Sequence, residues 1–163
     1  MADTQGMDAA QPDLASIARE RGIEYFLISF VDMGGTLRAK MVPAAAIADM
    51  QQDGAGFAGF AAIMDLTPAH PDMFAMPDGN SLIQLPWKPE VGWLAADLWM
   101  DGGPIESAPR VALKRMIQSL NDHGYRPMAG VECEYHLVKR DSHDLADDHD
   151  TANKPCYDQS ALM

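Results

Sequence analysis

Glu132 and Glu134 are the two residues whose type and spacing point most directly to chemistry. Both lie in the stretch Tyr125–Val138, whose apolar residues predict a β-strand. Residues i and i+2 of a strand point to the same face, so the two carboxylates would lie side by side. Two such carboxylates repel each other unless a cation, a shared proton or water lies between them. A pair of divalent ions with oxygen ligands is one solution, and a solvated strand face is the structural alternative.

Both cysteines are expected to be free thiols. Cys133 separates the two glutamates and would point to the opposite face of the strand, where we expect it to pack in the core. With Cys156 it forms neither a disulfide framework nor a zinc-binding spacing, which is typical of a protein of the reducing cytoplasm. The segment Asp141–Asp150 contains five aspartates and no Lys or Arg, which indicates a solvated loop, with cation binding as the lesser alternative.

The overall charge narrows the classes of partner. The 163 residues include 24 acidic and 12 basic side chains, which gives a formal net charge of −12. A chain without a basic stripe is poorly suited to bind nucleic acid or an anionic membrane surface. Residues 1–12 are polar and lack the apolar stretch of a signal peptide, so we expect a flexible N-terminus on a cytoplasmic protein. A hydrophobic content of 47% is enough to form a core.

Local patterns predict an alternation of helices and strands. Asp13 is a suitable cap for a first helix, and Gly22 is suited to end it. The residues Gly34 and Gly35 predict the turn of a hairpin. The predicted helices are Leu14–Arg21, Ala44–Gln52 and a longer one between a Ser107 cap and Gly124. The predicted strands are Glu24–Asp32, Thr36–Val42, Ser81–Leu85, Val91–Leu98 and a strand within Tyr125–Val138 that carries the two glutamates.

The segment Gly54–Asp78 is predicted to be a long irregular loop, because glycine and proline interrupt its apolar residues. Its residues Gly54, Gly56 and Gly59 match the spacing of a dinucleotide-binding motif. That motif requires a strand before it and a helix after it, whereas here a helix comes before it and a loop after it. We therefore interpret the glycines as a helix end followed by close backbone packing.

Several short motifs follow one another at regular places along the chain. They are Phe30–Asp32, Gly34–Gly35, Arg38–Lys40, Asp72–Asp78, Asp97–Leu98, Pro109–Arg115 and Gly130–Tyr135. Their order and spacing are together specific, and over residues 17–138 the chain resembles the glutamine synthetase family. Within the family, the segments Gly54–Phe60 and Leu66–Asp72 are most similar to the branch of type III glutamine synthetases and gamma-glutamylmethylamide synthetases.

The resemblance implies an α+β fold. Residues 13–104 would form an N-terminal β-grasp domain, and residues 105–163 would form the incomplete start of the glutamine synthetase catalytic α/β domain. The remaining metal ligands, the ATP contacts and the glutamate-binding arginines of the family would lie beyond Met163. We therefore expect the chain to be a piece of a longer enzyme that does not catalyse the reaction alone. An inactive fragment or paralogue with an assembly or regulatory role is the alternative.

The resemblance also implies an activity. ATP would phosphorylate the γ-carboxylate of glutamate, and ammonia or a small amine would then displace phosphate to form an amide. Glu132 and Glu134 match the two glutamates of the family motif that bind Mg²⁺ or Mn²⁺. Such ions neutralise phosphate charge and align the reacting groups during phosphoryl transfer. Identical subunits would form a ring, with each active site between the catalytic domain of one subunit and the β-grasp domain of its neighbour.

One residue departs from the common bacterial pattern of the family. At the position of Ala58, common bacterial glutamine synthetases carry an aspartate that helps bind and deprotonate ammonium. Without that carboxylate the site favours a small cation less, and an alanine leaves room for a methyl group. We therefore expect an acceptor larger or less polar than ammonium, with methylamine as the leading candidate. Asp65, seven residues further on, is a candidate to replace part of the missing charge.

Overall fold

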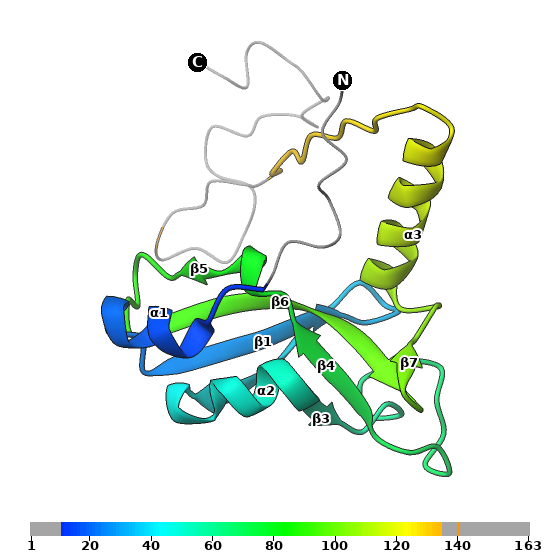
Figure 1. The fold of residues 1–163 in the computed structure, drawn as a ribbon. Coiled ribbons are helices and arrows are strands. Elements are labelled where there is room, and N and C mark those ends of the chain that lie inside the picture. The colour runs from blue at the N-terminus through cyan, green and yellow to red at the C-terminus, as the bar shows by residue number, and fades with distance from the viewer. Residues whose placement is uncertain (1–10, 135–139, 141–163) are drawn as a thin grey trace. The chain divides into compact units, whose positions relative to one another are not determined.

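The computed structural model describes residues 11–134 and Arg140. The chain divides into two compact units, residues 1–127 and 128–163. The first unit is built on a mixed β-sheet with helices (Figure 1). Its elements are α1 (Leu14–Arg21), β1 (Tyr25–Val31), β2 (Leu37–Pro43), η1 (Ala44–Ala46), α2 (Ile47–Asp53), β3 (Ala55–Phe57), β4 (Met73–Pro77), η2 (Gly79–Ser81), β5 (Ile83–Gln84), β6 (Val91–Met100), β7 (Gly103–Pro104) and α3 (Pro109–Asp122).

Strand β6 organises the sheet, whose order among the described strands is β2-β1-β6-β4-β3. The first half of β6 pairs in parallel with β1, with Tyr25 opposite Val91, and its second half pairs antiparallel with β4, with Phe74 opposite Trp99. The short strands β5 and β7 also pair with β6. The hairpin of β1 and β2 lies at one edge of this sheet, and β3 lies at the other (Figure 1).

The hydrophobic core lies on the face of the sheet that carries α1 and α2. In β1, the alternating residues Phe26, Ile28 and Phe30 are buried, and they cluster with Leu14 of α1 and Ile47 of α2. Since successive residues of a strand point to opposite faces, the two helices cover one face of β1. No helix of the described part of the chain is long and apolar enough to cross a membrane.

The first helix and the hairpin form where the sequence predicts them. The Asp13 side chain accepts a hydrogen bond from the Ser16 N–H, and Gly22 ends α1 in a left-handed conformation, as expected for both caps. Strands β1 and β2 pair antiparallel from Tyr25–Pro43 to Val31–Leu37. The predicted helix Ala44–Gln52 is present as η1 followed by α2.

Three predictions for elements of the first unit are wrong. The predicted loop Gly54–Asp78 contains β3 and β4, which are short strands that form by pairing along the sheet. The predicted strand Ser81–Leu85 is reduced to the two residues of β5, because the turn η2 occupies its start. The cap of α3 is Ala108 rather than Ser107, because Pro109 is pre-organised for the first position of a helix.

The glycine motif has the structure of a helix end, as interpreted from the sequence. Gly54 follows α2 with φ 78° and ψ 167°, a region that is open almost only to glycine. A Cβ atom there would lie 2.7 Å from the Met76 Sδ atom, so the backbone packs closely against β4. At Gly59, a Cβ atom would lie 2.2 Å from Cδ1 of Leu66. The first strand after α2 is β3, so the strand-then-helix order of a dinucleotide site is absent here.

We expect Gly54→Ala to lower the free energy of unfolding by about 1–3 kcal/mol, because the new side chain strains the backbone and crowds Met76. Urea unfolding of the chain measures the change. Gly103→Ala is the matched control, since no atom lies within 4 Å of its added Cβ and its φ is not positive. An effect at Gly54 no larger than that at Gly103 would contradict the prediction.

Candidate functional site

Ala58 and Asp65 lie in the segment that joins β3 to β4. The carbonyl oxygen of Ala58 accepts hydrogen bonds from the N–H groups of Ala61 and Ala62, which folds the segment back in a tight turn. Ala62 and Met64 are buried in the core cluster, so this part of the segment is attached to the body of the unit. Ala58 is half-buried and Asp65 is exposed, and both precede the point where the segment turns toward β4.

The second half of the segment is also held by its own hydrogen bonds. The Thr67 N–H donates to Nδ1 of His70 at 3.0 Å, and the His70 N–H donates to the Thr67 carbonyl at 3.0 Å. Residues Pro68 and Pro71 lie in or beside this turn, which accounts for its irregular backbone. Both contacts of His70 with Thr67 hold this turn together, which indicates a structural role for the histidine.

The turn of the β1–β2 hairpin is organised by one buried carboxylate. Asp32 is only 1% exposed, and it accepts hydrogen bonds from the N–H groups of Gly34 and Thr36 and from Nε of Arg38, at 2.9, 2.9 and 2.7 Å. The hydrogen bond from Thr36 lowers the pKa of Asp32; burial opposes this shift, and the bonds from Arg38 and Gly34 add to it. The turn therefore holds a permanently charged aspartate at neutral pH, which fixes the backbone that follows Val31.

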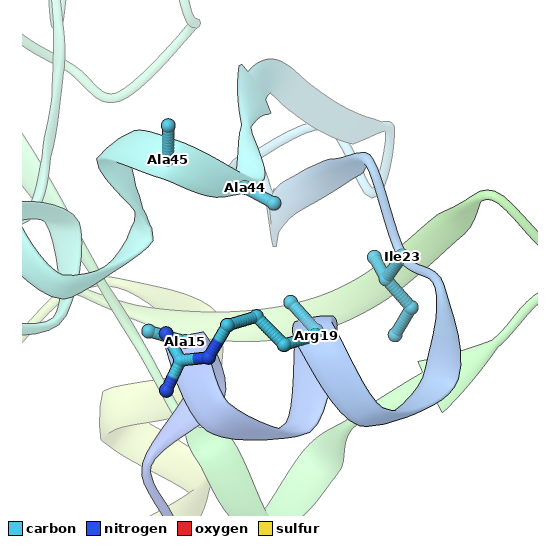
Figure 2. A pocket seen from close by; sticks show the side chains of 6 residues that line it. Ala15, Arg19, Ile23, Ala44 and Ala45 are labelled. Carbon is cyan, nitrogen blue, oxygen red and sulfur yellow. The ribbon is translucent and has the colours of Figure 1, made fainter.

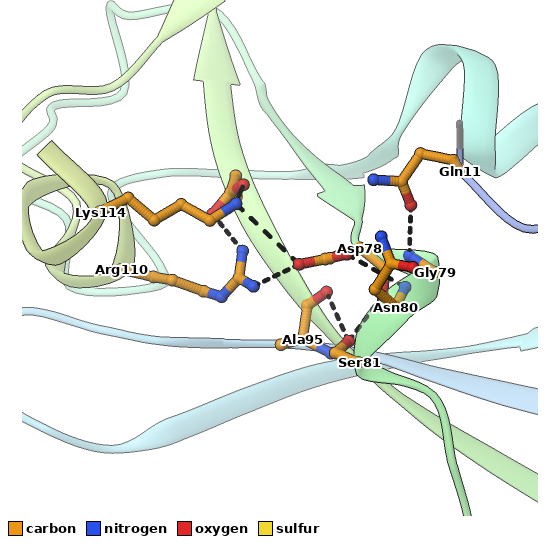
Figure 3. A network of polar contacts seen from close by, with 9 residues as sticks. Gln11, Asp78, Gly79, Asn80, Ser81, Ala95, Arg110 and Lys114 are labelled. Atoms are coloured by element: carbon orange, nitrogen blue, oxygen red, sulfur yellow. Dashed lines mark hydrogen bonds and ion pairs between the residues drawn. The ribbon is translucent and has the colours of Figure 1, made fainter. Parts of the chain in front are cut away.

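Four charged side chains connect α3 to the sheet (Figure 3). The guanidinium of Arg110 donates to Asp97 at 2.5 Å and to Asp78 at 2.6 Å. One turn further along α3, Lys114 donates to Asp97 at 2.6 Å. Asp97 belongs to the face of β6 opposite the buried residue Leu98, so α3 attaches to the face of the sheet that α1 and α2 leave open.

The charges of this cluster stabilise one another. Burial alone would raise the pKa of Asp78, but the hydrogen bond and the charge of Arg110 outweigh it and place that pKa below its ordinary value. Burial would likewise lower the pKa of Arg110, and its bonds to Asp78 and Asp97 raise it instead. Asp78 and Arg110 are therefore ionised at neutral pH, and their contact is an ion pair rather than an acid–base pair.

Around Asp78, backbone and side-chain bonds fix η2 to its surroundings. The Asp78 side chain accepts from the Asn80 N–H, and the Ser81 hydroxyl accepts from the Ala95 N–H at 2.8 Å. The Gln11 side chain accepts from the Gly79 N–H at 2.7 Å, which connects the start of the described chain to the same turn (Figure 3). These hydrogen bonds anchor the turn that carries Asp78 to β6.

The members of this cluster belong to motifs noted in the sequence, but the contacts between these motifs were not predicted. Asp78 ends one motif, Asp97 begins another, and Arg110 and Lys114 belong to a third. A signal was present in the sequence, because Arg110 and Lys114 are four residues apart and therefore share a face of the helix. The sequence did not show which acidic residues this face would meet.

Glu132 and Glu134 lie in the second unit and are both exposed. The strand predicted within Tyr125–Val138 is absent from residues 125–134, which have no regular secondary structure, and residues 135–138 lie outside the described part of the chain. A strand needs a partner for its backbone groups, and none of the sheet pairs involves these residues. Cys133 is exposed rather than in a core, and the adjacent Val131 is 94% exposed.

The chemistry of the two glutamates suits a hard divalent cation, because carboxylate oxygens are the ligands that Mg²⁺ and Mn²⁺ prefer. Two carboxylates are part of a coordination sphere rather than a whole one. Within residues 11–134, no group of three or more His, Cys, Asp and Glu side chains is arranged to hold a metal ion. The pair is thus a candidate for two ligands of a larger set.

A small hollow lies between α1 and η1 (Figure 2). It is lined by alanines, by Ile23 and by the stem of Arg19, whose guanidinium donates to the Ser16 hydroxyl at 2.8 Å. None of the site residues predicted from the sequence lines it. With apolar walls and a single cation, this hollow offers no group that would act as an acid, a base or a nucleophile at neutral pH.

The sequence and the fold have close counterparts among known proteins. The chain is 58% identical over 151 residues to a glutamine synthetase of Rhizobium leguminosarum bv. phaseoli, a match that covers 93% of this chain and 35% of the relative. It is 37% identical over 148 residues to a glutamate–methylamine ligase of Methyloversatilis universalis, covering 88% and 34%. A solved structure described as the GmaS/ADP complex matches with a TM-score of 0.77 and 56% identity, covering 92% of this chain and 35% of that one.

The two sequence relatives are named as a synthetase and a ligase, and the mixed α/β structure of the chain matches a region of the solved structure. The chain belongs to the glutamine synthetase family, which confirms the resemblance seen in the sequence motifs. It spans about a third of the length of the relatives that it matches. No protein-family model matches the chain.

Proposed function

We propose that the full-length protein is an ATP-dependent ligase that forms a γ-glutamyl amide from glutamate and a small amine. The observation that carries this proposal is the 58% identity over 93% of the chain to a protein of the glutamine synthetase kind. The reaction would pass through γ-glutamyl phosphate, with the amine displacing phosphate. The match to a structure described as an ADP complex supports a nucleotide substrate. Charge and composition support a cytoplasmic location.

We assign residues 13–104 to a β-grasp domain and residues 105–163 to the start of the catalytic domain. A mixed sheet whose neighbouring strands β1 and β6 run parallel, with helices on one face, supports the first assignment. The second assignment makes the cluster of Asp78, Asp97, Arg110 and Lys114 the connection between the sheet of one domain and the first helix of the next. Identical subunits would assemble in a ring, in which the β-grasp domain of one subunit completes the active site of its neighbour.

We assign Glu132 and Glu134 as ligands of the Mg²⁺ or Mn²⁺ ions that the reaction requires. Divalent ions supply neutralisation of phosphate charge and alignment of the attacking and leaving oxygens. The two glutamates would bind the ions through their carboxylate oxygens. Both side chains are exposed in the described chain, so their oxygens are accessible to an ion. Asp78 and Asp97 are unsuited to this role, because Arg110 and Lys114 already occupy their oxygens.

We assign the segment around Ala58 to the site that accepts the amine, and methylamine is our leading candidate for the acceptor. A methyl group in place of a carboxylate removes a charge that would favour ammonium. The similarity to a glutamate–methylamine ligase supports this direction. Asp65 follows in the same segment, is exposed, and would supply a carboxylate at the rim of the site.

The acceptor is tested with the full-length protein, ATP, glutamate and a panel that contains ammonia, methylamine and ethylamine. We expect kcat/KM to be highest for methylamine. We expect Ala58→Asp to shift the ratio of the kcat/KM values for ammonia and methylamine by roughly tenfold toward ammonia, because one methyl group in a fitted site is worth about that factor. Amide formation and ADP release are measured together.

Ala45→Asp is the matched control, since Ala45 is an exposed alanine of η1, outside the segment assigned to the acceptor. We expect it to leave the ratio within a factor of about two. A wild-type preference for ammonia over methylamine in kcat/KM would refute the assignment of the acceptor. The absence of amine-dependent ADP release with every amine would refute the ligase and favour an assembly or regulatory role.

A further inference from the structure

Lys40 makes two contacts with the residues that lead into Ala58. Its Nζ atom donates a hydrogen bond to the carbonyl oxygen of Gly56, and it lies 5.1 Å from the centroid of the Phe57 ring. Hydrogen bonds from an ammonium group are stronger than those between neutral groups, and a cation over an aromatic face adds attraction. Lys40 belongs to β2 and the other two residues to β3, so the side chain connects strands at opposite edges of the sheet.

The Phe57 ring also packs against the hydrophobic core. The Phe57 ring packs edge-on against Phe30, with 4.9 Å between the ring centroids and 87° between the planes. Phe30 is buried, so Phe57 lies between a fixed aromatic partner and the Lys40 ammonium. An aromatic ring held on two sides has few alternative rotamers, and the backbone at residues 56–58 is fixed with it.

The same hairpin also contacts the far end of the turn that contains Ala58. The N–H of Met33, in the turn between β1 and β2, donates to the carbonyl of Ile63 at 3.2 Å. The turn of the hairpin is fixed by Asp32, whose carboxylate accepts hydrogen bonds from two backbone N–H groups and from Arg38. The hairpin therefore holds the segment Phe57–Ile63 at both of its ends.

We propose that Lys40 is a positioning residue for the amine acceptor: with the hairpin turn, it sets the geometry of the segment that carries Ala58 and thereby the affinity for the amine. This inference rests on the proposed function of that segment. A small substrate makes few contacts, so its binding depends on placement of the surrounding atoms to within a fraction of an ångström. Lys40 itself contacts the loop and is not assigned to the reacting atoms.

The kinetic test compares Lys40→Met, Lys40→Arg and Lys88→Met in the full-length protein. Methionine keeps the length of the side chain but cannot donate, arginine keeps the charge and the donors, and Lys88 is an exposed lysine between β5 and β6. We expect Lys40→Met to raise KM for methylamine about tenfold while KM for ATP and for glutamate stay within twofold. We expect Lys40→Arg to restore most of the affinity and Lys88→Met to change nothing.

A second measurement does not depend on catalysis. The N–H groups of Ala61, Ala62 and Met64 donate to the carbonyls of Ala58 or Gly59, so their hydrogen exchange reports the order of the segment. We expect exchange of these amides to be about tenfold faster in Lys40→Met than in the wild type and in Lys88→Met. Unchanged exchange in peptides from β6 shows that the variant remains folded.

The two measurements separate the failure of this inference from that of the proposed function. Faster exchange together with a selective rise in KM for the amine supports the inference. Unchanged exchange in Lys40→Met overturns it, whatever the activity. Faster exchange with equal losses for all three substrates also overturns it, because Lys40 would then act on stability alone. If the wild type uses no amine, the proposed function fails, and with it the assignment of the segment to an amine.

Discussion

Replacing either Glu132 or Glu134 with glutamine in the full-length protein is expected to lower kcat/KM for amide formation by at least about 100-fold. Residues that only support a metal ligand already change affinity or activity by about 10- to 100-fold, and a direct ligand should exceed that. Glutamine keeps the shape and one oxygen of glutamate but loses the negative charge that holds a hard cation. The assigned role in the metal site therefore predicts a large effect from a small chemical change.

The measurement that distinguishes this role from others is the dependence of activity on Mn²⁺. We expect each variant to need a higher Mn²⁺ concentration for half-maximal activity, and direct titration of Mn²⁺ to show weaker binding. The double variant should lose little more than the worse single variant, since residues that act as one unit are not additive. Glu20→Gln, at an exposed position of α1, is the matched control.

Activity and Mn²⁺ dependence within about threefold of the wild type in both variants would contradict the assignment. That result would leave the structural alternative, in which the two carboxylates are simply solvated. The dependence of activity on Mn²⁺ therefore distinguishes metal ligands from a solvated pair of carboxylates.

The elements predicted correctly are those whose signals are local. Helix α1 has a capping aspartate and a terminal glycine, and the hairpin has the turn residues Gly34 and Gly35 between its two strands. Each of these signals acts within a few residues, so tertiary contacts did not need to be known. The same holds for β6, the longest strand, whose apolar content is high along its whole length.

The elements that were missed depend on partners far away in the sequence. Strand β4 is a strand because Phe74 and Ala75 pair with Trp99 and Leu98 of β6, not because its own sequence alternates. The opposite error occurred at residues 125–134, where a strand-like composition has no paired neighbour in the described chain. Composition indicates what a segment is suited to form, and pairing decides whether it forms.

The candidate site divides in the same way. The spacing of Glu132 and Glu134 suggested a metal site from their chemistry, whereas Ala58 became a candidate only through the resemblance to the glutamine synthetase family. The ion-pair cluster was not predicted, because Arg110 and Asp78 are 32 residues apart and Arg110 and Asp97 are 13 apart. Only the folded sheet brings these residues together, so the cluster could not be predicted before the fold was known.

Replacing Arg110 with methionine is expected to lower the free energy of unfolding of the chain by roughly 2–3 kcal/mol, between the values typical of exposed and of fully buried ion pairs. The side chains of Arg110, Asp78 and Asp97 are 27%, 18% and 20% exposed, so the pairs are only partly screened by water. Without the guanidinium, the half-buried carboxylates of Asp78, just after β4, and Asp97, on β6, have only Lys114 to neutralise them.

Arg115→Met is the matched control on the same helix. Among the residues that the structure describes, Arg115 pairs only with Glu106, and the two side chains are 60% and 74% exposed. We expect its replacement to change the free energy of unfolding by about 0.5 kcal/mol or less, because exposed ion pairs contribute little. The comparison therefore separates loss of the network from loss of any arginine in α3.

The effect of Arg110→Met should depend on pH in a defined direction. The pKa of Asp78 lies below its ordinary value of 3.8 in the folded wild type, so its contribution is present above that value and is lost as the pH falls through the folded pKa. In the variant, burial acts without Arg110 and raises the pKa of Asp78, so protonation relieves the unpaired charge. We therefore expect the difference in free energy of unfolding between the wild type and the variant to shrink from pH 7 to pH 3. A difference that stays constant over this range would show that Arg110 stabilises α3 through packing of its stem rather than through its charge.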